Sequence, residues 1–279
     1  MKKTVKELLD EAVLMLQHLD TAQLDAEILL AFTLRTSRER LFAHPGKSVP
    51  DGIAADFQSL ISKRIVHYPI AYLTGNREFW SMEMLVSQDT LIPRPETEIL
   101  VEAALAMIPD HTPLNVLDLG TGSGAIAIAL AAERPQCRII AADVSQEALA
   151  LAQENAVRHG IENIEFRVSD WFSAFPGLEF DLVVTNPPYV DSRDRGFDTG
   201  EIRYEPRIAL DGGYLGLKMF NHIIPSAREY LKPGAGLILE HGFDQGESIR
   251  YLFMTNKFVD VVTRTDYSGL ERISIGRRG

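Results

Sequence analysis

The sequence lacks the features that mark secreted, membrane and metal-binding proteins. Its 279 residues include one cysteine, Cys137, so an internal disulfide is impossible and nothing indicates an oxidising compartment. The longest apolar run, AIAIALAA at 125–132, is far shorter than the ~20 residues of a membrane-spanning helix. The histidines and the cysteine form no cluster with metal-ligand spacing. The N-terminal stretch contains acidic residues, unlike secretory signals and transit peptides. We therefore expect a cytoplasmic protein that uses neither a membrane nor a metal.

An excess of basic residues is also missing. The formal net charge is −11, whereas proteins that bind a phosphate backbone usually show a basic footprint. This balance argues against a direct nucleic acid substrate. The remaining composition, 46% hydrophobic and 24% charged, is that of a globular protein with one large domain or two smaller ones.

Two regions with different patterns predict two domains. Apolar residues recur at helical spacing over 4–17, 21–34 and 53–66, which predicts a small all-α domain over residues 1–75. We expect this domain to dock the substrate. Alternating and aromatic residues then predict a short β-hairpin linker over 76–92, and the rest, 93–279, forms the second domain.

The second domain repeats a pattern of strand, turn and helix. Apolar strands are predicted at 114–119, 138–143, 164–168, 180–185 and 236–241, with helices between most of them. This alternation predicts an α/β fold with a mostly parallel, Rossmann-like sheet covered on both faces. The last two apolar runs, FVDVVT and RISIG, are candidates for an antiparallel edge.

A glycine-rich turn, DLGTGSG at 118–124, follows the first of these strands. Glycines permit positive φ and close approach to a ligand, and the following helix N-terminus offers free N–H groups. The turn itself, Gly120, Thr121, Gly122, Ser123 and Gly124, suits both a dinucleotide and S-adenosyl-L-methionine.

Three side chains bear on the choice between these two cofactors, and Asp118 favours S-adenosylmethionine. Asp118 would repel a pyrophosphate but suits the ammonium and sulfonium groups of that cofactor. Asp143, at the end of the second strand, can accept both ribose hydroxyls with either cofactor. Trp171 follows the third strand, where an aromatic ring can hold an adenine. The alternatives are a strand-end cap for Asp118 and a packed core aromatic for Trp171.

The fourth strand ends in the segment NPPY, which carries the chemistry. Asn186 offers an amide oxygen and Pro187 a carbonyl, and both residues precede a proline, which favours an extended, restricted backbone. Two fixed acceptors suit a planar –NH₂ group, and Pro188 and Tyr189 complete its pocket. Holding both N–H bonds would aim the weak nitrogen nucleophile at a methyl donor. The alternative is a proline-rich strand exit capped by asparagine.

Together these residues resemble the class I S-adenosylmethionine-dependent methyltransferases, and in particular the PrmC/HemK family. Further segments match that family in order: LIPRPETE (91–98), SDWF (169–172), EPRIAL (205–210), LEHG (239–242) and DYSGLERI (266–273). The resemblance covers essentially the whole chain. One departure is Leu215, where the family commonly has aspartate.

The resemblance implies an activity. The expected reaction transfers the methyl group of S-adenosylmethionine to the side-chain nitrogen, N5, of the glutamine in the Gly-Gly-Gln loop of class I peptide chain release factors, and leaves S-adenosylhomocysteine. Asn186 would touch cofactor and glutamine. Arg94, Glu96 and Glu205 also match family motifs, but each has an equally good structural explanation.

Three other functions share part of this sequence pattern. A DNA or RNA adenine-N6 methyltransferase also acts on a conjugated –NH₂ group and shares NPPY, but the acidic charge and the lack of a basic, aromatic-rich region disfavour it. A non-catalytic cofactor-binding adaptor would have no use for two convergent acceptors. A nicotinamide dehydrogenase is disfavoured by Asp118.

Overall fold

The computed structural model describes residues 2–279, and the chain divides into two compact units. The helical unit runs to Asn76 and also contains Asp198–Tyr204. The α/β unit comprises Arg77–Phe197 and Glu205–Gly279. Met1, the first residue of the expected helical domain, lies outside the described residues.

The helical unit is built from short amphipathic helices. They are α1 (Val5–Met15), α2 (Ala22–Thr33), α3 (Arg38–Ala43), α4 (Asp51–Ile65) and α5 (Ile70–Thr74). Thr4 starts α1 through a capping box, because its hydroxyl accepts from the Glu7 amide while the Glu7 carboxylate accepts from the Thr4 amide. The helices bury one apolar core that includes Leu8, Leu16, Leu29, Phe57 and Ile61.

The returning segment Asp198–Tyr204 is fastened to the helical unit by polar contacts. The buried guanidinium of Arg64 pairs with Asp25 at 2.7 Å and with Glu201 at 2.7 Å. The hydroxyl of Tyr204 donates to the carbonyl of Val66 at 2.8 Å. Part of the polar segment that follows NPPY therefore belongs to the helical unit.

The α/β unit contains a hairpin and a seven-stranded sheet. The hairpin pairs β1 (Asn76–Phe79) with β2 (Met82–Leu85), and Trp80 and Ser81 form its turn with positive φ. The sheet strands are β3 (Asn115–Leu119), β4 (Arg138–Asp143), β5 (Ile164–Val168), β6 (Phe180–Thr185), β7 (Leu231–Glu240), β8 (Phe258–Thr265) and β9 (Glu271–Arg278). Their order is β5-β4-β3-β6-β7-β9-β8.

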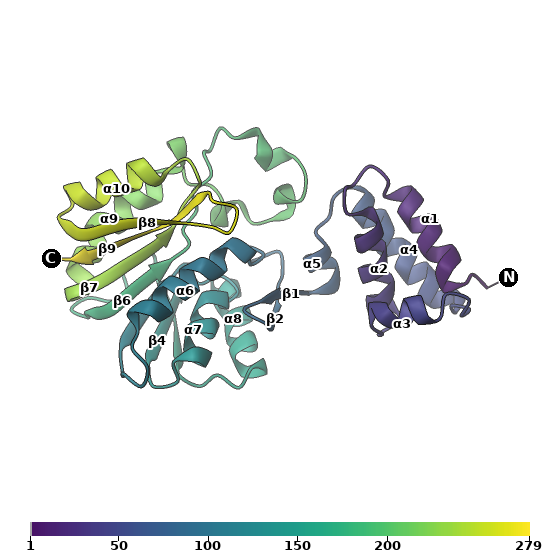
Figure 1. Cartoon of the computed structure of the whole chain (residues 1–279), viewed down its shortest axis with the longest axis horizontal. Coiled ribbons are helices and arrows are strands. Elements are labelled where there is room, and N and C mark those ends of the chain that lie inside the picture. Colours follow the sequence, from purple (N-terminus) through teal and green to yellow (C-terminus); the bar gives the residue numbers. More distant parts are fainter. Residues whose placement is uncertain (1) are drawn as a thin grey trace. The chain divides into compact units, whose positions relative to one another are not determined.

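The sheet has the predicted mixed character. Strands β3 to β7 pair in parallel, whereas β9 pairs antiparallel with both β7 and β8. The expected α/β fold, with an antiparallel edge and a helical N-terminal region, is confirmed (Figure 1).

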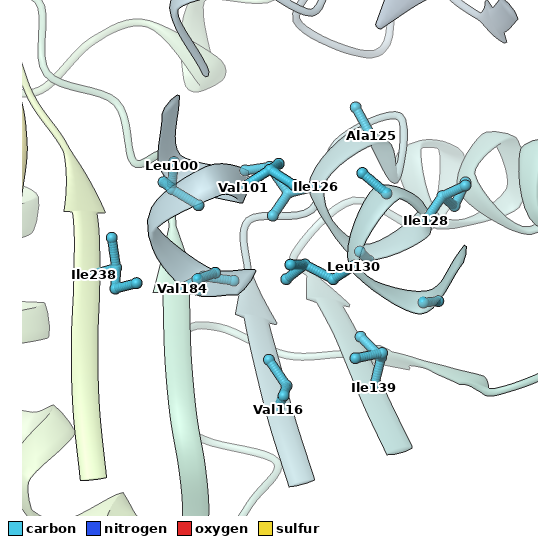
Figure 2. Packing of buried hydrophobic residues seen from close by; sticks show 14 of the residues in the cluster. Leu100, Val101, Val116, Ala125, Ile126, Ile128, Leu130, Ile139, Val184 and Ile238 are labelled. Carbon is cyan, nitrogen blue, oxygen red and sulfur yellow. The ribbon is translucent and has the colours of Figure 1, made fainter. Parts of the chain in front are cut away.

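Helices cover both faces of the sheet. They are α6 (Glu98–Met107), α7 (Ala125–Glu133), α8 (Gln146–Arg158), α9 (Lys218–Tyr230) and α10 (Gly246–Thr255), with short 3-10 turns η1 (Pro95–Thr97), η2 (Arg195–Asp198), η3 (Ile202–Tyr204), η4 (Arg207–Ala209) and η5 (Tyr214–Gly216). Figure 2 shows α6 and α7 packing side chains such as Leu100 and Leu130 over Val116 and Val184 of the strands. On the opposite face, α9 and α10 bury Phe220 and Phe253. Among residues 2–279, no helix is both long enough and apolar enough to cross a membrane.

The strand order reverses between β3 and β6, which are neighbours in the sheet. Ligands of open α/β sheets bind beyond the carboxyl ends of the strands at such a switch point. The glycine turn follows β3 and NPPY follows β6. The topology thus brings both sequence motifs to one edge of the sheet.

Candidate active site

A cavity of about 300 Å³ opens at this edge of the α/β unit. Seven of the predicted cofactor-binding residues line it: Gly120, Thr121, Gly122, Ser123, Asp143, Trp171 and Asn186. Asn186 also belongs to the predicted substrate pocket, and so does Pro188, which lines the cavity as well. The volume lies at the lower end of the ~300–1,000 Å³ typical of small-molecule sites. Gly124, Asp118, Pro187 and Tyr189 are not part of its wall.

The glycine turn is fixed by backbone hydrogen bonds to the end of β4. The amides of Gly120 and Thr121 both donate to the carbonyl of Ala142, at 2.8 and 2.9 Å. Gly124 has a φ of 84°, and a Cβ there would lie 3.0 Å from the Cβ of Ala152 in α8. Glycine at 124 therefore permits the close packing of α7 and α8, which explains its place behind the cavity wall.

Asp143 connects the turn to β4. Its Oδ2 accepts from the Gly122 amide at 2.9 Å and its Oδ1 from the Ser145 amide at 3.0 Å. Each carboxylate oxygen has two lone pairs, so both oxygens keep acceptor capacity. Because Asp143 also lines the cavity, it can accept hydroxyl groups of a bound ligand.

Asp118 lies buried behind the turn. The hydroxyl of Thr121 donates to its Oδ2 at 2.6 Å, whereas its Oδ1 has no hydrogen-bond partner within residues 2–279. Burial raises the pKa of Asp118 to about 7, the bond from Thr121 opposes this shift, and the nearby charge of Asp143 adds to it. The sequence suggested direct contact with the cofactor, but the structure places this carboxyl behind the wall.

Trp171 adds an aromatic surface to the cavity. Its backbone takes a φ of 48°, and the hydroxyl of Ser169 donates to its carbonyl at 2.6 Å. A Cβ added at Gly120 would lie 4.0 Å from the indole ring. The half-buried indole thus lies beside the glycine turn and also packs against the apolar core under α9 and α10.

The NPPY segment is positioned by groups far away in the sequence. Asn186 is half-buried, and its Nδ2 donates to the hydroxyl of Thr97 at 3.2 Å. Tyr189 donates its phenol proton to Oε1 of Glu240 at 3.1 Å. Burial, together with the charge of Glu240, raises the pKa of Tyr189 well above its usual value, so the phenol stays neutral.

Gln245 and Gly216 also hold the backbone of the NPPY segment in place. The Gln245 side chain donates to the carbonyls of Tyr189 and Leu215, at 3.0 and 3.1 Å. At Gly216, where φ is 67°, a Cβ would lie only 1.9 Å from the Tyr189 carbonyl oxygen. This close approach requires glycine.

Several residues of the site were not predicted from the sequence. Thr97 and Glu240 lie inside the family motifs LIPRPETE and LEHG. The sequence therefore marked both segments but gave neither residue a role. Arg94 also lines the cavity and is the one cation among its lining residues, beside Asp89, Asp143 and Asp170. It forms an ion pair with Glu205, whose carboxylate is buried and also accepts from the Ile92 amide at 3.0 Å.

Comparison with known protein families assigns both units. Residues 7–75 match the PrmC N-terminal domain, and residues 95–202 match the methyltransferase small domain. The similar solved structures include a methyltransferase from Pyrococcus furiosus, which is 19% identical with a TM-score of 0.54 over 81% of this chain and 99% of that one. Another is the 16S rRNA N2 G1207 methyltransferase of T. Thermophilus, 18% identical with a TM-score of 0.53 over 73% of this chain and 50% of that chain. These two likenesses establish the fold only.

The sequence relatives are much more similar. The release factor glutamine methyltransferase of Salmonella typhimurium is 46% identical over 96% of this chain and 97% of its own length. The protein of the same name from Escherichia coli is 45% identical with the same coverage, and that from Aliivibrio fischeri is 41% identical over 99% and 98%. With this identity over nearly the whole length of both chains, the protein belongs to the release factor glutamine methyltransferase family.

Proposed function

We propose that this protein methylates the side-chain nitrogen, N5, of the glutamine in the Gly-Gly-Gln loop of class I peptide chain release factors, with S-adenosyl-L-methionine as the methyl donor. Family membership supports the reaction, and it favours a protein glutamine over adenine in DNA or RNA. The observation that carries the proposal is the amide of Asn186: its nitrogen is bound to Thr97, which leaves its oxygen as an acceptor at the cavity.

The cavity suits S-adenosylmethionine. Gly120 to Ser123 would hold the cofactor beside the helix N-terminus, Asp143 would accept its ribose hydroxyls, and Trp171 would lie against its adenine. When bound, the cofactor supplies an electrophilic methyl group on a positively charged sulfur.

The chain's own contribution is the placement of the glutamine. Oδ1 of Asn186 and the carbonyl of Pro187 would accept the two N–H bonds of the substrate amide, and Pro188 and Tyr189 would enclose its planar group. With both protons held, the nitrogen lone pair points at the methyl group. Acceptors also bind the nitrogen more strongly as it becomes positive, which lowers the barrier.

Proton balance does not require a strong base. Once it carries the methyl group that the cofactor would supply, the amide nitrogen would be acidic enough to lose one proton to water. Because the Tyr189 phenol donates its proton to Glu240 and has a raised pKa, we assign Tyr189 no role as a base and expect its ring to enclose the substrate amide.

We further propose that the helical unit docks the release factor in the cytoplasm. It matches a domain model specific to this kind of protein. The cavity is small and cannot by itself select one loop of a folded protein. A separate unit that binds the release factor would supply that selectivity.

Transfer of label tests the proposed function. The protein is incubated with methyl-labelled S-adenosylmethionine and either a class I release factor, the same factor with its Gly-Gly-Gln glutamine changed to alanine, or adenine-containing DNA. Label should appear only on the unmodified release factor. Label on DNA, or equal label on the alanine variant, would overturn the proposal.

A further inference from the structure

A buried carboxylate, Glu240, joins the two parts of the NPPY pocket. It is the last residue of β7 and is 1% exposed. Its Oε2 accepts from the Thr97 hydroxyl at 2.7 Å, and its Oε1 accepts from the Tyr189 hydroxyl at 3.1 Å. One carboxylate therefore binds two side chains that reach it from different segments of the α/β unit.

The hydroxyl of Thr97 links Glu240 to Asn186 and determines how the Asn186 amide is oriented. A hydroxyl has a single proton, and Thr97 gives it to Glu240. Toward Asn186, 3.2 Å away, Thr97 can then only accept a hydrogen bond. Asn186 must present its NH₂ group to Thr97, and its carbonyl oxygen must face the other way.

The direction of this chain of bonds matters for the proposed reaction. An amide rotated by half a turn would present its NH₂ group to the substrate's own NH₂ group, and two donors cannot bind each other. Only the orientation set by Thr97 offers the acceptor that a glutamine nitrogen needs. Thr97 is a donor on that side because the carboxyl oxygens of Glu240 accept from both Thr97 and Tyr189.

The strand does not need this carboxylate for its own pairing. Glu240 lies in β7, whose backbone pairs with β6 and β9. A buried carboxylate is unfavourable for folding, and an apolar residue of similar size is often neutral or better for stability. Burial raises the pKa of Glu240, while the hydroxyls of Thr97 and Tyr189 and the positive charge of Arg272 oppose that shift.

We propose that Thr97 and Glu240 are positioning residues for methyl transfer: together they fix the amide of Asn186 with its oxygen toward the substrate, and Glu240 fixes the ring of Tyr189. This inference rests on the proposed function. Thr97 lines the cavity beside Asn186, and Glu240 lies buried behind it. In this proposal both residues act through Asn186 and Tyr189.

Paired substitutions at Thr97 test the direction of the bonds. Thr97→Val keeps the shape but removes the hydroxyl, so the amide of Asn186 loses its partner. We expect kcat for release factor methylation to fall about tenfold or more, the tenfold corresponding to ~1.4 kcal/mol, while KM and the Kd of S-adenosylmethionine change less than about threefold. Thr97→Ser, which restores the hydroxyl, should recover most of the loss.

Glu240→Gln tests the carboxylate itself. A glutamine has one acceptor and one NH₂ group, so either Thr97 or Tyr189 must reverse its hydrogen bond. We again expect a loss in kcat with little change in cofactor binding.

Thr255→Val is the matched control for Thr97→Val. The Thr255 hydroxyl bonds only to carbonyls within its own helix, so this variant should keep wild-type kcat.

A second readout does not depend on turnover. Hydrogen exchange of the Asn186 side-chain NH₂ group, followed by nuclear magnetic resonance, should be slow in wild type and Thr97→Ser and about tenfold faster in Thr97→Val. Wild-type kcat and slow exchange in Thr97→Val would overturn the positioning role. If the wild-type protein fails to methylate any release factor, the proposed function fails instead, and the exchange measurement still decides the orientation.

Discussion

The hydroxyl of Thr185 donates a hydrogen bond of 2.7 Å to the carbonyl of Leu119. These are the last residues of β6 and β3, the strands on either side of the switch point. The bond joins the start of the glycine turn to the start of NPPY. The spacing between the proposed cofactor site and the substrate acceptors is therefore set by a single buried contact as well as by the sheet.

Loss of this contact should affect both stability and turnover. Thr185→Val leaves the buried Leu119 carbonyl without its partner, which costs ~1–3 kcal/mol of unfolding free energy. We expect this destabilisation in urea denaturation, together with a fall in kcat because the two halves of the site lose their alignment. Unchanged kcat in the destabilised variant would show that the sheet alone sets the spacing.

Gly216 should be intolerant of any side chain. Gly216→Ala would place a Cβ 1.9 Å from the Tyr189 carbonyl oxygen and 2.5 Å from the Gln245 amide, so NPPY or η5 must move. We expect a loss of stability of several kcal/mol and a strong loss of methylation. Gly177→Ala is the matched control, since Gly177 has a similar φ of 76° but no atom within 4 Å of the added Cβ. It should show only the strain of positive φ, ~1 kcal/mol. Equal effects of the two substitutions would contradict the steric explanation.

Asp118 should make stability depend on pH. Its pKa is raised from an ordinary 3.8 to about 7 by burial, so the folded state holds a proton that the unfolded state releases. The resulting stability is fully present below about pH 4 and is lost as pH rises through 7, by up to ~1.4 kcal/mol per pH unit. Asp118→Asn cannot titrate, so its unfolding free energy should fall less between pH 5 and pH 7.5 than that of wild type. Parallel curves for the two proteins would contradict the buried, protonated state.

Leu215 occupies a backbone conformation that suits another residue. Its φ is 56°, and its side chain is 48% exposed. Asparagine tolerates this left-handed region better than leucine does. Leu215→Asn should therefore raise the unfolding free energy by ~1 kcal/mol, measured by urea denaturation. A loss of stability would mean that the leucine side chain makes contacts that outweigh the backbone strain.

Much of the fold could be predicted because its signals are local. The apolar strands 114–119 and 138–143 and the glycine turn between strand and helix are contiguous patterns, and they correspond closely to β3, β4 and the start of α7. The short helices α3 and α5 were missed, since six and five residues are too few to show a helical period.

The sequence motifs that line the candidate site could be predicted, but the hydrogen bonds between distant segments could not. The sequence singled out Asn186 and Tyr189 by residue type, yet the bond from Thr97 to Glu240 joins residues 143 positions apart, and no local pattern encodes such a contact. Asp118 shows the opposite case. Its place before the glycines predicted contact with the cofactor. In the structure its side chain points toward α7 and is buried there.

The most direct test concerns Asn186, because the account requires its amide oxygen to hold the substrate nitrogen. Single-turnover methylation of a class I release factor should be measured with wild type and Asn186→Ala, with the modified residue located by mass spectrometry. We predict one methyl group on the Gly-Gly-Gln glutamine with wild type. With Asn186→Ala we expect a rate lower by ~10²–10³, as for the loss of one key transition-state hydrogen-bonding group, at an unfolding free energy within ~1 kcal/mol of wild type. A wild-type rate in Asn186→Ala, or a methyl group on any other residue, would contradict the account.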